Sequence, residues 1–196
     1  MILTFDDGPG PSTSALLDVL AAAGVKATLF VLGANVEARR DIAVRAAREG
    51  HELGNHTYSH ARPGALDAVA FAAELARTDA LIIDVLGDAG VVQPVIRVRL
   101  PYGIVGRDDP RVAVLSALGR EHVGWTADFE DWLDPDPADL VEQMRRVIAR
   151  QADAVVDLHD SSKLGARRDA TVHAVRLLLS EHRPARPEAD AGRQVP

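Results

Sequence analysis

The sequence has no cysteine, few aromatic residues and no long hydrophobic run, and each absence excludes a class of protein. Without cysteine the chain can form neither disulfides nor thiolate metal sites. No apolar run approaches the roughly 20 residues that a membrane-spanning helix needs, so we expect no membrane segment. Apolar residues make up 47% of the chain but aromatic residues only 4%, so Ala, Val and Leu must build most of a globular core.

Acidic side chains outnumber basic ones by 29 to 22, which gives a formal net charge of -7. This balance argues against nucleic acid as the main partner. The length of 196 residues suits one sizeable domain, which we expect over residues 1–182. The tail 183–196 is rich in proline and mixed charges and is predicted to be disordered. We expect a monomer. The absence of a secretion signal predicts a cytoplasmic location, or an extracellular one if the N-terminus is processed or truncated.

Short β-branched or apolar runs alternate with longer helical patterns along the whole chain. Strands are expected at 2–5, 26–32, 52–54, 95–98, 122–125 and 154–158. Helices are expected from Ser12 or Ser14 to Gly24, from Asn35 to Gly50, over 66–86 and 111–118, from Asp136 to about Ile148, and over 169–181. This alternation predicts an α/β fold of parallel strands with helices outside, arranged as a barrel or near-barrel rather than as two domains.

Polar clusters follow five of the expected strands. They lie at 6–7, 56–60, 99–102, 128–132 and 159–160. In a parallel barrel these positions share one rim, which is where active sites lie.

The first two clusters have the composition of a metal site. One Asp with His56 and His60 supplies three ligands and leaves an open position for water, which points to hydrolysis. Two His four residues apart project from one face of a helical turn, about 6 Å apart. The second Asp of the pair Asp6-Asp7 then stays off the cation and takes a proton. The alternative is an Asp-Gly turn that closes a strand. His51 is interpreted as structural.

Two further clusters fit the same chemistry. Arg99 can hold the base Asp by a charge-assisted pair, and the Tyr102 backbone N–H can face an oxyanion, because Pro101 has no N–H. His159 can protonate a leaving group if Asp131 raises its pKa. The alternatives are an exposed Arg before a turn and an ordinary polar pair at a strand end.

The motifs taken together resemble one family. They read TFDDGP at 4–9, KATLFVLG at 26–33, GNHTYSH at 54–60, RLPYG at 99–103 and W-x-x-D-x-x-D-W at 125–132. In order and spacing they resemble the polysaccharide deacetylase family, the NodB homology domain of carbohydrate esterase family 4. The resemblance runs from Ile2 to about Leu179.

The resemblance implies a distorted (β/α) barrel, a divalent metal that is zinc or else cobalt, and hydrolysis of an N-acetyl group. The substrate would be an N-acetylated amino sugar of a chitooligosaccharide or peptidoglycan-type glycan. The implied roles are metal binding by Asp7, His56 and His60; general base for Asp6, held by Arg99; oxyanion donor for the Tyr102 amide; general acid for His159, paired with Asp131; and substrate contact by Trp132, Tyr102, Asp157 and Leu158.

One residue departs from the family pattern. The fifth motif usually reads Leu-x-His, with the Leu in the acetyl pocket, and here that position is Asp157. A buried carboxylate there is costly unless it is paired or protonated. The alternatives are therefore a different acyl group, or a small cytoplasmic amide or cyclic imide hydrolysed by the same chemistry. A non-catalytic sugar-binding module that keeps the fold is a separate alternative.

Overall fold

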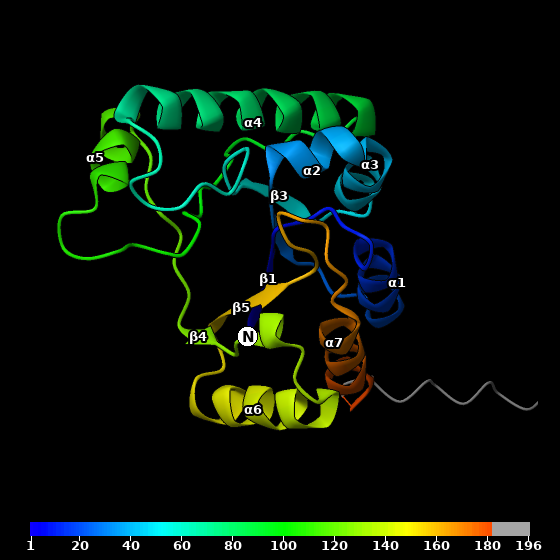
Figure 1. Cartoon of the computed structure of the whole chain (residues 1–196). Coiled ribbons are helices and arrows are strands. Elements are labelled where there is room, and N and C mark those ends of the chain that lie inside the picture. The colour runs from blue at the N-terminus through cyan, green and yellow to red at the C-terminus, as the bar shows by residue number, and fades with distance from the viewer. Residues whose placement is uncertain (182–196) are drawn as a thin grey trace, which may run out of the picture.

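The computed structural model describes residues 1–181, so the predicted disordered tail lies outside the described residues. Five parallel strands form one sheet in the order β3-β2-β1-β5-β4, and helices surround it (Figure 1). The elements are β1 Ile2–Asp6, α1 Thr13–Ala23, β2 Thr28–Val31, α2 Gly33–Ala38, α3 Arg40–Arg48, β3 Glu52–Asn55, α4 Ala68–Ala89, α5 Pro110–Ala117, β4 Ala127–Asp128, the 3-10 helix η1 Asp131–Leu133, α6 Pro137–Arg150, β5 Val155–His159 and α7 Asp169–Glu181. The predicted α/β class is confirmed. In the described part of the chain, no helix has both the length and the apolar character to cross a membrane.

The sheet continues past β3 only through single bridges, which makes the barrel a distorted one. Val98 pairs with Asn55 on one side and with His122 on the other. The strands predicted at 95–98 and 122–125 are therefore reduced to these bridges. Before Val98, the Gln93 side chain accepts from the Leu53 N–H and donates to the Leu53 carbonyl. A side chain thus takes the place of a neighbouring strand at this edge.

Helices cover one face of the curved sheet, where Leu3, Phe5 and Leu158 lie in the main core. On the other face Thr4, Asp6 and Asp157 contact the buried Arg99. The helices α2, α3 and α4 form one group and α6 and α7 form another (Figure 1). The main core is built mostly of Leu, Val and Ala, as the composition predicts. A smaller cluster beneath α4 and α5 contains Phe71, Leu75, Val98, Leu100 and Leu115.

Two predicted helix caps have other roles. Ser12 is the residue before α1, but its hydroxyl donates to Asp169 and so joins α1 to the start of α7. Asn35 lies inside α2, and its amide donates to the backbone carbonyl of Asp7 at 2.6 Å. The polar side chain at 35 is therefore used to hold a loop at the strand ends instead of capping a helix.

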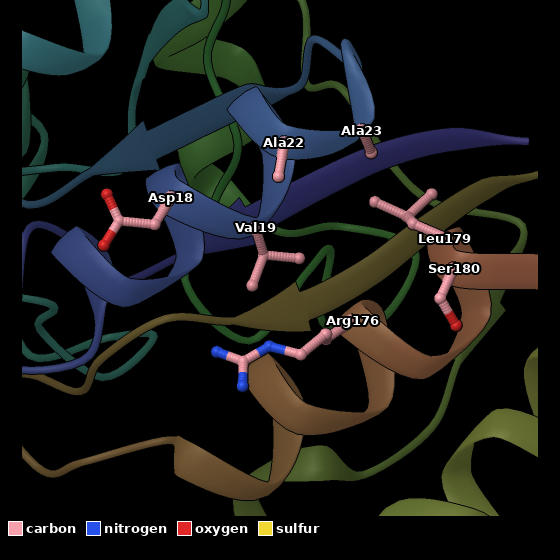
Figure 2. Close-up of a pocket in the computed structure, with 7 residues that line it drawn as sticks. All are labelled: Asp18, Val19, Ala22, Ala23, Arg176, Leu179 and Ser180. Atoms are coloured by element: carbon pink, nitrogen blue, oxygen red, sulfur yellow. The ribbon is translucent and has the colours of Figure 1, made fainter. Parts of the chain in front are cut away.

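A hollow with a mixed polar and apolar lining lies between α1 and α7. Its volume is about 300 Å³, and Figure 2 shows that Asp18, Val19, Ala22 and Ala23 face Arg176, Leu179 and Ser180 across it. It contains none of the residues that the sequence analysis selected for chemistry.

A glycine in β3 is required by close packing. A Cβ on Gly54 would lie 2.4 Å from the Phe30 ring, which is fully buried and lies under the Arg99 guanidinium at 4.2 Å. Gly54→Ala should therefore lower the free energy of unfolding by about 1–3 kcal/mol, measured by urea denaturation. Gly87→Ala is the matched control, because it lies in α4 with open space around it and should raise stability by about 0.5–1 kcal/mol. Equal effects of the two changes would contradict this account.

Candidate active site

The polar clusters meet in one pocket at the carboxyl ends of the strands. The pocket has a volume of about 410 Å³. It is lined by Asp6, Asp7, His56, His60, Leu100, Tyr102, Trp125, Asp128, Trp132, Asp157 and His159. Two more of the predicted residues, Arg99 and Asp131, are buried directly behind this lining.

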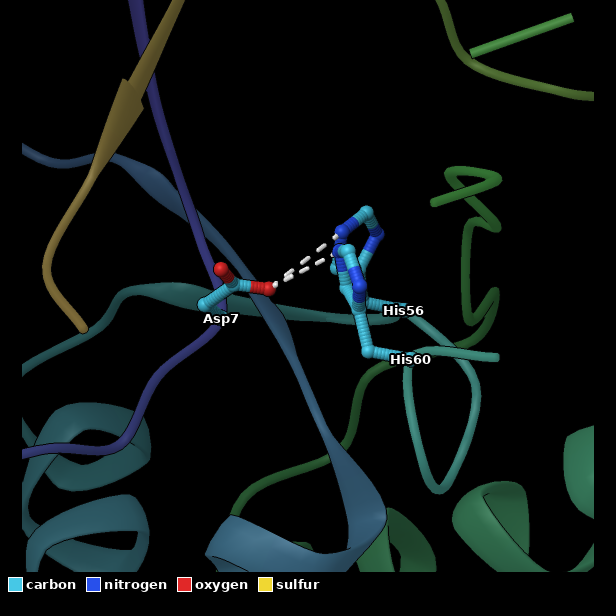
Figure 3. A group of neighbouring side chains, drawn as sticks. All are labelled: Asp7, His56 and His60. Atoms are coloured by element: carbon cyan, nitrogen blue, oxygen red, sulfur yellow. Dashed lines mark ion pairs between the residues drawn. The ribbon is translucent and has the colours of Figure 1, made fainter. Parts of the chain in front are cut away.

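Three of the lining residues form a group that could hold a metal ion. One ligand atom from each of Asp7, His56 and His60 lies within 4.8 Å of the other two. Asp7 Oδ1 lies 3.7 Å from His56 Nε2 and 3.3 Å from His60 Nε2. Figure 3 shows the carboxylate pointing at both imidazole rings. The predicted ligand set is thus brought together.

The chemistry of these donors fits a cation. Asp7 Oδ1 is buried and makes no hydrogen bond within residues 1–181. Burial raises the pKa of the Asp7 carboxyl, and the charge of Asp6 adds to this. Burial, with the neighbouring His56, lowers the pKa of His60 to about 3, so its imidazole is neutral. The His56 Nδ1–H donates to the Arg99 carbonyl at 2.9 Å, which leaves Nε2 free as a ligand atom.

The segment that carries the two His is a loop, so the predicted helical turn is wrong. Thr57 and His60 both have positive φ, at 68° and 55°, which no helix allows. The two rings still lie 5.2 Å apart between centroids. A spacing of four residues brings side chains together in a tight bend as well as in a helix, so the pattern predicted the proximity but not the backbone.

Two residues that the sequence analysis missed hold this loop. Glu74 on α4 accepts from the backbone N–H groups of Tyr58 and Ser59 at 3.2 and 3.1 Å. Asn55 accepts from the Thr57 N–H and donates to the Leu75 carbonyl. Asn55 precedes the first His directly and could have been noticed, but Glu74 is remote in sequence and carries no such signal.

The remaining Asp of the pair is bound to Arg99, as predicted. Arg99 Nη1 donates to Asp6 Oδ1 at 2.9 Å, and Asp6 Oδ2 lies 3.5 Å from His56 Nε2. The guanidinium is fully buried and also donates to Thr4 and Asp157. Asp6 therefore has one oxygen fixed and the other directed at the metal group.

His159 and Asp131 form the second buried pair. Asp131 accepts from His159 Nδ1 and from the His159 backbone N–H, both at 2.8 Å, and Thr171 donates to the same carboxylate at 2.6 Å. Burial alone would lower the pKa of His159, but the hydrogen bond and charge of Asp131, with the charges of Asp6 and Asp157, raise it to about 10. Trp132 lies edge-on to the His159 ring, with the centroids 5.3 Å apart. Asp160, the residue after His159, instead accepts from the Thr13 hydroxyl.

The Tyr102 turn presents a free backbone donor. Tyr102 has φ 63°, and its N–H makes no hydrogen bond to another residue in 1–181. Arg111, which the sequence analysis also missed, donates to the carbonyls of Pro101 and Gly103 and fixes the turn from behind. The Tyr102 ring lies against His60.

Two residues of β5 are predicted to bind substrate, and the structure places them on opposite faces of the strand. Asp157 lines the pocket, whereas Leu158 is fully buried in the hydrophobic core. Successive residues of a strand point to opposite faces, so Leu158 cannot share the face of Asp157 and His159. Its predicted contact with substrate is not supported by this placement.

Comparison with known proteins fits this arrangement. A family model described as polysaccharide deacetylase matches residues 1–123. The chain belongs to the polysaccharide deacetylase family. It is 35% identical over 189 residues to a chitooligosaccharide deacetylase of Rhizobium leguminosarum bv. trifolii, covering 90% of this chain and 82% of that protein. The resemblance inferred from the motifs is confirmed.

Solved structures of the family share the fold. The peptidoglycan deacetylase PdaC from Bacillus subtilis matches with a TM-score of 0.74 and 28% identity, over 92% of this chain and 81% of that one. A pseudoenzyme of carbohydrate esterase family 4 from Bacillus anthracis matches with a TM-score of 0.74 and 25% identity, over 92% and 59%. Because the fold also occurs in a pseudoenzyme, the residues of the site must carry the argument for activity.

Removal of one candidate ligand should weaken metal binding. His60→Ala should lower the affinity for a divalent ion, with zinc as the probe, by at least about 100-fold in chelator competition, because only two donors remain. His173→Ala, at an exposed position of α7, removes an imidazole elsewhere and should leave the affinity unchanged. Zinc affinity that survives the loss of His60 would exclude this group as the site.

Loss of the Asp131 carboxylate should change the titration of His159. Asp131→Asn should lower the pKa of His159 well below about 10, because only the charges of Asp6 and Asp157 then oppose the effect of burial. NMR titration of the His Cε1–H signal measures this shift, and the exposed Asp153→Asn is the control. Because the folded-state pKa is raised, the stability that this pair contributes is complete below about pH 6.5 and is lost as pH rises through about 10. A wild-type His159 that titrates near neutrality would contradict the assignment.

Proposed function

We propose that this chain is a metal-dependent hydrolase that removes N-acetyl groups from an amino sugar of a chitooligosaccharide or peptidoglycan-type glycan. The chitooligosaccharide and peptidoglycan deacetylases that it resembles act on such glycans. The observation that carries the proposal is the convergence of three metal donors, a carboxylate on a buried Arg and an imidazole on a buried Asp in one pocket.

Asp7, His56 and His60 would hold the metal, and zinc is the ion that this mixture of imidazole and carboxylate suits best. A divalent ion in such a site supplies Lewis acidity and makes water a better nucleophile at neutral pH. Three protein donors leave room for solvent and substrate, as catalytic sites require.

Asp6 is the proposed general base. Its Oδ1 is occupied by Arg99, so Oδ2, which faces His56, is the atom available to take a proton from the attacking water. The permanent charge of Arg99 fixes the carboxylate in this orientation.

His159 is the proposed general acid. Its pKa of about 10 keeps the imidazole protonated at neutral pH, and its Nδ1 is engaged by Asp131, so Nε2 is the atom that can deliver a proton to the departing amine. An amine leaves an amide only when it is protonated, which explains why the site needs an acid as well as a base.

The Tyr102 N–H is the proposed donor to the oxyanion, since it is free of other hydrogen bonds within the described chain. Donors of this kind lower the barrier by about 3 kcal/mol each. Trp132 is 39% exposed and stands at the pocket rim beside His159, where it would wall the substrate.

The relatives do not favour the alternative of a small cytoplasmic amide or cyclic imide. Against a non-catalytic module stands the presence of every predicted ligand, base and acid in the pocket, with Arg99 and Asp131 in contact behind them. Cytoplasmic location and the monomeric state stay predictions.

Acetate release tests the proposal. The zinc-loaded protein should release acetate from N-acetylglucosamine oligomers, and Asp6→Asn should reduce kcat by about 10²–10⁴-fold while zinc stays bound. Asp84→Asn, the same change at an exposed site on α4, should have no effect. Absence of acetate release by a protein shown to contain zinc would refute the function, and full activity of Asp6→Asn would refute the role of the base.

A further inference from the structure

Asp157 lies at the floor of the pocket. On β5 it precedes His159 by two residues and so faces the same side. The register pairs His159 with Asp6 and Asp157 with Thr4, which places Asp157 one layer deeper than the acid and the base. An acyl carbon held between Asp6 and His159 would direct its substituent toward this floor.

Only one oxygen of Asp157 has a protein partner. Oδ1 accepts from Arg99 Nη1 at 3.1 Å, on the same nitrogen that serves Asp6. No residue within 1–181 donates to Oδ2, and this oxygen is not among the fully buried polar atoms without a partner. The side chain is only 5% exposed, and it lines the pocket. A hydrogen-bond donor from outside the protein therefore reaches Oδ2 through the pocket.

A methyl group is a poor occupant of such a floor. An acetyl methyl placed against Oδ2 would displace water from a buried carboxyl without replacing its hydrogen bond, which is costly. A hydroxyl on the same carbon restores the bond. Burial, with the charge of Asp6, raises the pKa of Asp157, but a hydroxyl can donate to the carboxylate or accept from the carboxylic acid, so it pairs with either form.

A cationic substituent fits less well than a neutral one. Arg99 already occupies the other oxygen of Asp157, so an ammonium group would approach a buried guanidinium of like charge. The fitting substituent is therefore small, neutral and able to hydrogen-bond.

We propose that Asp157 selects the acyl group, and that the preferred substrate is the hydroxyacetyl (glycolyl) amide of an amino sugar over the acetyl amide. This inference rests on the proposed function and names its substrate more closely. In the reaction, water adds to the acyl carbon, the C–N bond breaks, and glycolate and the free amine are released.

The test compares two oligomers of glucosamine that have equal length and carry either N-glycolyl or N-acetyl groups. For the zinc-loaded wild type, kcat/KM should be about 10- to 100-fold higher on the glycolyl oligomer, which is the cost of leaving one buried hydrogen-bonding group unsatisfied. Asp157→Leu should reverse the preference. Asp157→Asn, which keeps the shape and a hydrogen-bonding amide, should still favour glycolyl. Asp153→Leu, at an exposed loop position, is the matched control and should leave the ratio unchanged.

Binding gives a second measurement that does not depend on turnover. Calorimetry on the zinc-loaded wild type should show tighter binding of glycolate than of acetate, and Asp157→Leu should lose this difference. Melting temperature and zinc content check each variant, and if Asp157→Leu fails to fold, the wild-type ratio and Asp157→Asn decide.

The outcomes separate the two proposals. Equal or better kcat/KM of the wild type on the acetyl oligomer overturns the selection by Asp157, and so does a ratio that a folded Asp157→Leu leaves unchanged. Either result leaves the deacetylase function intact. Absence of acetate release by the zinc-loaded wild type would instead refute the deacetylase function, and release of neither acyl group would refute this inference with it.

Discussion

The site depends on one buried residue, Arg99, which positions both the proposed base and one of the proposed metal ligands. Its guanidinium fixes Asp6, and its backbone carbonyl accepts from His56 Nδ1 and so orients a metal donor. A buried guanidinium is costly unless its donors are satisfied. Here two carboxylates, Thr4 and the carbonyls of Val123 and Gly124 accept from it. Because these partners come from opposite sides of the open barrel, the residue also joins its weakly paired edge to β1 and β5.

The carboxylates of Asp6 and Asp7 reach the same pocket only because the backbone turns at the end of β1. Consecutive strand residues point to opposite faces, so Asp6 and Asp7 would be separated if β1 continued. Asp7 instead has φ 72°, a left-handed conformation that costs a non-glycine residue about 1–2 kcal/mol. The Asn35 amide bound to the Asp7 carbonyl and the packing of the 8–10 turn against Asp160 and Ser161 hold it there. The strain therefore serves to place a base beside a metal ligand.

The alternation of parallel strands and helices could be predicted from the sequence, whereas the long-range contacts that fix the loops could not. Polar residues that follow five of the expected strands are predicted to lie at one rim, because parallel strands end together. The partners that hold the loops, such as Glu74 and Thr171, come from helices and have no local pattern. Residues 95–98 have strand propensity but gain only one bridged residue, because the Gln93 side chain takes the neighbouring hydrogen bonds. Strand alternation from His159 places Leu158 on the opposite face of β5, so the sequence itself excludes Leu158 from the pocket.

The acid and the base are distinguished by the partner behind each one. Arg99 places a permanent positive charge against Asp6, whereas Asp131 places a carboxylate against His159 and raises its pKa to about 10. Each partner is buried and held in place by further hydrogen bonds. Two titratable groups with opposite tasks can thus lie side by side in one pocket. Asp157 has no such partner of its own, because it shares the Arg99 guanidinium with Asp6. A carboxyl that the protein leaves half-satisfied has an unmet hydrogen-bonding capacity, and only a molecule that enters the pocket can meet it.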